Sequence, residues 1–175
     1  MLLGGATALL PIYARDVLLV GLWGLGLLRS APALGALAMA MVITRWGVKR
    51  HAGRWALVAV AGFGVATIAF GLSADPLLSF VALLAVGATD QVSMFVRQTL
   101  IQLSTPDEMR GRVSAVTSLF IGASNQLGEF ESGSVTVLIG AVPAVVLGGV
   151  GAVGLAGLWA VMFPALRRVD RLLGR

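Results

Sequence analysis

Five long apolar stretches, separated by short polar gaps, constrain the fold of this 175-residue chain more than any other feature. Each stretch has about 18 residues or more, which is enough for an α-helix rising 1.5 Å per residue to cross a hydrocarbon core of about 30 Å. A sixth apolar stretch is cut short by the start of the chain. The six stretches cover 2–12, 23–44, 56–73, 77–103, 113–140 and 142–163.

The composition favours helices in lipid. The chain is 58% hydrophobic and 12% charged, whereas about a quarter of the residues in a soluble domain are charged. Helices satisfy their own backbone hydrogen bonds where there is no water, and the alternating segments of a transmembrane β-barrel are not seen in the sequence. We therefore expect an all-α polytopic membrane protein. Its six transmembrane helices are predicted near 1–18, 23–44, 55–73, 76–103, 106–140 and 142–166, with the first one truncated.

The basic residues predict the orientation of these helices. They gather at 45–54, at 104–112 and in the tail after 166, whereas the gaps at 74–76 and 141–143 contain no lysine or arginine. Basic residues in short loops favour the cytoplasmic side. We expect a multi-pass protein of the cell (inner or plasma) membrane with both termini in the cytoplasm. The net charge of +5 is then explained by membrane anchoring, and no nucleic-acid partner is expected.

Charged side chains inside the apolar stretches are the candidate functional residues, because a charge at membrane depth is costly and usually faces a cavity or a partner. Helical rise places Arg29 about 9 Å and Glu129 about 6 Å from the outer surface, so we expect both to face one polar cavity. Asp90 lies about 21 Å from the outer end of its helix, and Arg97 follows on the same face. The predicted residues for substrate and proton coupling are Arg29, Asp90, Asn125, Gln126 and Glu129.

Each charge also has a purely structural interpretation. Arg29 could be paired only for folding, and Arg97 could extend to the inner headgroups. Asp90 could instead hold the cytoplasmic loops through Arg110 or Arg112.

Proline and small residues predict local features. Thr105 is predicted to cap a helix that starts at Pro106, with Glu108 closing a capping box. Pro76 and Pro143 are expected at helix starts in the same way. A ladder of small residues in the last helix predicts close packing against another helix; it comprises Gly148, Ala152, Ala156 and Ala160.

The stretch 90–133 resembles major facilitator superfamily transporters. Its centre, Pro106, Asp107, Glu108, Met109, Arg110, Gly111 and Arg112, is similar to the P-x-x-x-R-G-R loop that joins the fourth and fifth helices of a six-helix half. The stretch 119–128 looks like the branch of bacterial exporters that includes the enterobactin exporter and the transmembrane secretion effectors. The resemblance implies the C-terminal half of a twelve-helix transporter, with a missing N-terminal half as its partner. Substrate sites of such transporters lie between the halves near the midplane.

The function implied is proton-coupled export of a small organic molecule, drug-like or siderophore-like, by alternating access. Two alternatives remain: a non-transporting membrane scaffold or truncated product, and a half-size transporter that acts as a homodimer. An intramembrane enzyme is not expected, because the sequence has no P-loop, H-E-x-x-H or G-x-S-x-G motif. No metal or other cofactor is expected: the chain has no cysteine, and its one histidine, His51, lies in a basic loop.

Overall fold

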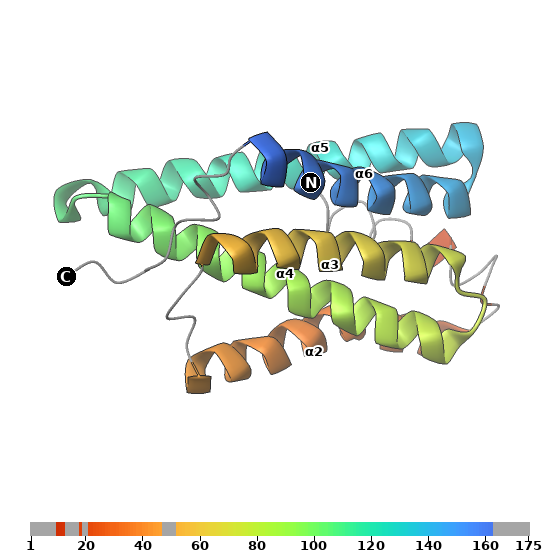
Figure 1. Ribbon diagram of the computed structural model, residues 1–175. Helices are drawn as coiled ribbons and strands as arrows, with labels where there is room; N and C mark the ends of the chain where they lie inside the picture. Colours follow the sequence, from red (N-terminus) through yellow and green to blue (C-terminus); the bar gives the residue numbers. More distant parts are fainter. Residues whose placement is uncertain (1–9, 13–17, 19–20, 47–51, 163–175) are drawn as a thin grey trace.

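The computed structural model describes residues 10–12, 18, 21–46 and 52–162. Its elements are helical and alternate in direction, so that consecutive helices run antiparallel (Figure 1). Four of them are long and apolar enough to cross a membrane, in agreement with the predicted all-α membrane fold. The elements are α2 (Leu22–Trp46), α3 (Ala52–Leu72), α4 (Pro76–Ser104), the 3-10 turn η1 (Asp107–Met109), α5 (Arg110–Ile139) and α6 (Ala141–Met162).

The predicted boundaries agree with these helices to within a few residues, except at α5. The first predicted helix, 1–18, lies largely outside the described residues, as do 163–166 of the last one. Of the first helix, 10–12 form a helical turn, and Leu10 and Leu18 are buried in the core beside Leu28 and Leu83.

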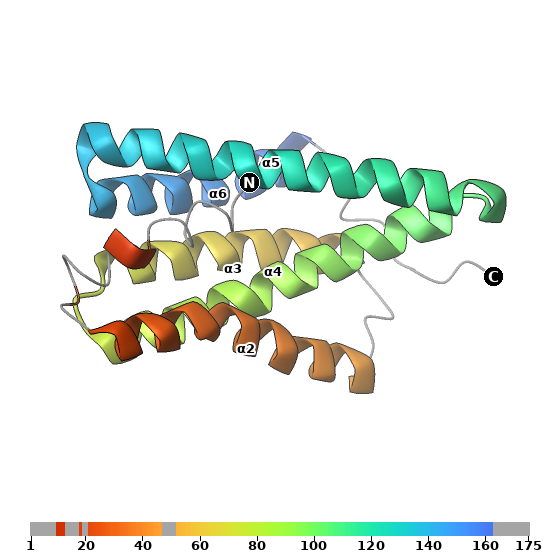
Figure 2. The same cartoon turned by 180° about the vertical axis from the view of Figure 1, so that it is seen from behind.

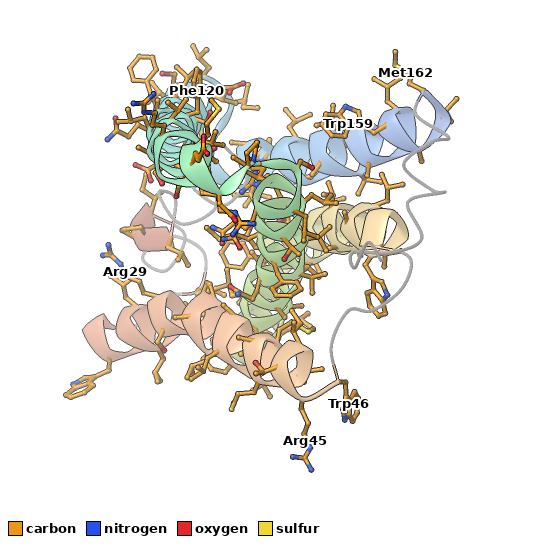
Figure 3. All side chains as sticks on the ribbon, turned by 90° about the vertical axis from the view of Figure 1, so that its left-hand side faces the viewer. Arg29, Arg45, Trp46, Phe120, Trp159 and Met162 are labelled. Atoms are coloured by element: carbon orange, nitrogen blue, oxygen red, sulfur yellow. The ribbon has the colours of Figure 1, made fainter. Side chains whose placement is uncertain are left out.

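α4 lies in the middle of the bundle (Figure 3). It packs against α2 on one side and against α3 on the other, and α3 also packs against α6. α5 packs against α6 and the adjoining turn η1, and Gly128 is its buried residue. α3, which carries no charge after Arg54, therefore joins the two parts of the bundle.

Glycines allow the closest helix contacts. A Cβ atom on Gly35 of α2 would overlap the carbonyl oxygen of Leu84, and one on Gly87 of α4 would overlap the carbonyl oxygen of Pro32. Backbone therefore touches backbone where α2 crosses α4, which only the absence of a side chain permits.

The prediction that a ladder of small residues on α6 packs against another helix is partly correct. Ala152 and Ala156 are buried as predicted, but Gly148 is exposed and Gly149 takes its place. A Cβ atom on Gly149 would lie 2.8 Å from the carbonyl oxygen of Gly64 in α3, because α3 approaches α6 on the Gly149 side.

The start of α4 forms as predicted. Pro76 occupies the first turn, and Asp75 caps the helix by accepting a hydrogen bond of 2.9 Å from the backbone nitrogen of Leu77. The hydroxyl of Ser73 donates to the carbonyl oxygen of Asp75 at 2.9 Å, and the hydroxyl of the buried Ser79 donates to Ser73 at 3.1 Å. These bonds tie the turn between α3 and α4 to the core.

The predicted helix start at Pro106 is wrong. Thr105 donates its hydroxyl to the carbonyl oxygen of Ile101 at 2.6 Å, so it ends α4 and leaves no cap for the next helix. Pro106 precedes the 3-10 turn η1, and α5 begins at Arg110 without a side-chain cap. α5 has 30 residues but is not among the four apolar spans, because polar and charged side chains interrupt its apolar sequence.

Candidate functional site

The charged residues predicted within the membrane lie on three different helices. Arg29 is on α2, Asp90 on α4 and Glu129 on α5. α2 packs against α4, whereas the described contacts of α5 are with α6 and η1. Figure 2 shows α2, α4 and α5 on the face of the bundle opposite to α3. The helices that carry the three charges thus lie together on one side of the molecule.

Arg29 is exposed on α2 and lies about 10 Å along the helix from its start at Leu22. Its side chain extends from α2 toward the side on which α5 runs, beside the helical turn at 10–12 (Figure 3). Within the described part of the chain the ion pair is Arg110–Asp107, and Arg29 and Glu129 are not joined. The described residues therefore do not show Arg29 and Glu129 meeting in the predicted common cavity.

Asp90 is half-buried on α4, fourteen residues from the start of the helix at Pro76. Arg97 lies two turns further along the same face and is exposed. The same face of α4 is buried at Ser79, Leu83 and Val86 in the outer half. Asp90 and Arg97 thus lie on the part of this face that neighbouring helices bury less completely.

The three predicted residues on α5 differ in their surroundings. Asn125 is half-buried, whereas Gln126 and Glu129 are exposed. Gln126 lines a shallow, open hollow formed by one face of α5, together with Ala115, Ser118, Leu119, Gly122 and Ala123. Glu129 lies one helical turn beyond Gln126, next to this hollow. Glu129 lies about 15 Å along α5 from the observed helix end at Ile139, which is further from that end than predicted.

The loop motif forms a charged tip between α4 and α5. Arg110 contacts Asp107 at 2.7 Å, an exposed pair in which both side chains reach solvent. Pairs of this kind contribute at most about 1 kcal/mol, so the pair orients the turn more than it stabilises the fold. Pro106, Glu108, Gly111 and Arg112 are all exposed around it. Neither Arg110 nor Arg112 pairs with Asp90 in the described structure.

A second polar stripe on α5 was not predicted. It consists of half-buried hydroxyl side chains on another side of the helix from Gln126. One of them, Thr136, donates a hydrogen bond of 2.7 Å to the carbonyl oxygen of Ser132 in its own helix. The exposed Ser134 likewise donates to the carbonyl oxygen of Phe130 at 2.9 Å. Their spacing of seven, eight and four residues, close to whole helical turns, was the available signal. The half-buried members are Thr117, Ser124, Ser132 and Thr136.

The residues present can bind charge, donate and accept hydrogen bonds, and exchange protons. They include no group of three or more histidine, cysteine, aspartate or glutamate side chains that could hold a metal ion, within the ranges that the structure covers. Comparison with known proteins gives no match to a family model, to a curated protein or to a solved structure.

Proposed function

We propose that this chain is one six-helix half of a membrane transporter of the major facilitator type, which exports a small amphiphilic organic molecule in exchange for protons. The observation that carries the proposal is the position of Arg29, Asp90 and Glu129: all three lie well inside long helices, and the chain itself leaves them wholly or partly uncovered. Charge in contact with hydrocarbon costs about 2.5–3.5 kcal/mol or more per side chain. Such residues persist where they face water or a partner.

A polar wall of this composition suits a transport pathway. Glu129 and Asp90 supply carboxylates that can take up and release protons at two depths. Arg29 supplies a fixed positive charge for an anionic substrate group or for a carboxylate. The amides of Asn125 and Gln126 can donate and accept hydrogen bonds. The apolar surface beside them accommodates the hydrophobic part of the substrate.

Alternating access requires a second bundle against which this one can rock. In the proposal the exposed side of α2, α4 and α5 forms one wall of the cavity, and a second six-helix unit forms the other. The exposed loop at 106–112 lies on the cytoplasmic side and anchors the bundle at the membrane surface.

The test is drug efflux in everted vesicles that contain the complete chain. We expect a protonophore to abolish accumulation of the transported compound, and Glu129→Gln or Asp90→Asn to reduce the rate about tenfold or more, the usual scale for lost proton transfer. Glu131→Gln is the matched control, because Glu131 points about 160° away from Glu129 around α5. Unchanged rates in both acidic-site variants would reject the proposed function.

A further inference from the structure

Two exposed or half-buried ribbons of mostly small residues carry Arg29 and Glu129, which are not paired with each other among the described residues. On α2 the ribbon follows helical spacing through Arg29, and we call it the α2 ribbon. On α5 it follows the same spacing through Glu129, and we call it the α5 ribbon. The α2 ribbon comprises Gly26, Arg29, Ala33, Ala36 and Ala40, and the α5 ribbon comprises Ser118, Gly122, Gln126, Glu129 and Gly133.

In the described part of the chain, helix packing does not require the glycines of these ribbons. A Cβ atom on Gly26, Gly122 or Gly133 would meet no atom within 4 Å, whereas one on Gly35 or Gly87 would overlap a neighbouring backbone. Open glycines also occur on α6, where no charge accompanies them. The combination of small residues with a charge therefore singles out the two ribbons, since small residues in membranes let a second helix approach closely.

The charges of the two ribbons are complementary in sign and depth. Arg29 lies about 10 Å and Glu129 about 15 Å from the outer ends of their helices, a difference that an arginine side chain can span. They are not paired with each other in the ranges that the structure describes. The exposed side chains of α3 and α6, by contrast, are apolar and suit lipid; they include Val58, Val65, Val150, Leu155 and Val161.

We propose that a second copy of this chain covers the two ribbons. Arg29 of one protomer then pairs with Glu129 of its partner, and a two-fold axis along the membrane normal repeats the contact, so that the α2 ribbon of each copy packs on the α5 ribbon of the other. This inference rests on the proposed function, because the second copy supplies the other wall of the transport cavity and part of its charge.

Charge exchange in trans tests the pairing. Arg29→Glu alone and Glu129→Arg alone place like charges opposite each other in a homodimer, and we expect each to lower the dimer fraction in membranes about tenfold. Co-expression of the two single variants restores both pairs in the heterodimer and should restore dimerisation. The double variant Arg29→Glu/Glu129→Arg restores the pairs within its own homodimer and controls for folding of the reversed charges.

Cysteine cross-linking provides the readout. The chain has no cysteine, so Gly26→Cys and Gly133→Cys introduce the sole thiols. Co-expressed, these two variants should cross-link between copies. The control pair, Val65→Cys with Leu155→Cys on the exposed side of α3 and α6, should not.

Three results would contradict the proposal that a second copy covers the ribbons. The first is the absence of a cross-link between the ribbons. The others are a loss of the dimer that co-expression does not restore, and rescue by the double variant alone. The last result would show that the two charges pair within one chain. Transport is measured separately, so proton-driven efflux that needs Glu129 without a dimer would reject only this inference. A dimer without efflux would reject only the proposed function.

Discussion

At the scale of single residues, the structure separates glycines that helix packing requires from glycines that it does not. Gly35 and Gly87 lie where the backbones of α2 and α4 touch, and Gly64 and Gly149 lie where α3 meets α6. Helices in lipid gain little from hydrophobic burial against one another, so close van der Waals contact between small residues holds them together. For the stability of the bundle, the small size of the residues at these few positions is therefore more important than their hydrophobicity.

Replacing Gly87 with alanine should destabilise the bundle. The new methyl group would overlap the Pro32 carbonyl group, whose carbon lies 2.5 Å away, and the helices must separate to admit it. We expect a loss of about 1–3 kcal/mol, as for overpacked cores. Tryptophan fluorescence during unfolding in mixed micelles measures this change. Gly151→Ala, in open space on α6, should change stability by less than about 1 kcal/mol; equal stability of the two variants would contradict the close crossing.

At the scale of elements, local sequence can set where a helix begins, whereas packing against other helices decides which of its faces are exposed. The start of α4 is set locally, because Asp75 caps it, Pro76 fits its first turn and Ser73 ties the preceding turn to Ser79. The start of α5 is not set in this way, since Thr105 bonds backward onto α4. The described contacts of α5 are mainly with α6 and η1, so most of its polar side chains remain exposed.

Asp75→Ala should lower the free energy of unfolding by about 1 kcal/mol, the usual contribution of an N-cap side chain. The hydrogen bond to the Leu77 nitrogen needs only a side-chain oxygen at position 75. Asp75→Asn should therefore retain nearly all the stability in the same unfolding assay. If asparagine proved as destabilising as alanine, the cap would not account for the effect.

At the scale of the whole molecule, the two sides of the bundle differ in chemistry. α3 and α6 expose apolar residues, whereas α2, α4 and α5, which lie together on the other side (Figure 2), carry Arg29, Asp90 and Glu129 beside exposed apolar residues. Exposed tryptophans also mark the two ends: Trp23 at the start of α2, and Trp46 and Trp55 at the opposite end. Tryptophan favours membrane interfaces, so these positions agree with a bundle that crosses the bilayer.

The turns at the two ends should lie on opposite sides of the membrane. Ala74→Cys, between α3 and α4, and Glu108→Cys, in η1 before α5, place single thiols on a cysteine-free chain. An impermeant maleimide added to intact cells should label position 74, and it should label position 108 only after the membrane is opened. Labelling of both positions in intact cells would contradict the topology, because α4 would then not span the bilayer.

The sequence by itself determined the helical fold, the approximate helix boundaries and the charges to examine, because these follow from apolar length, loop charge and local signals such as Asp75 and Pro76. That Arg29 and Glu129 are not paired with each other among the described residues became visible only in three dimensions. The tertiary structure also decided which glycines touch another backbone and which side of the bundle keeps its charges uncovered. Local patterns fix a helix, whereas the faces that meet depend on how helices distant in sequence cross.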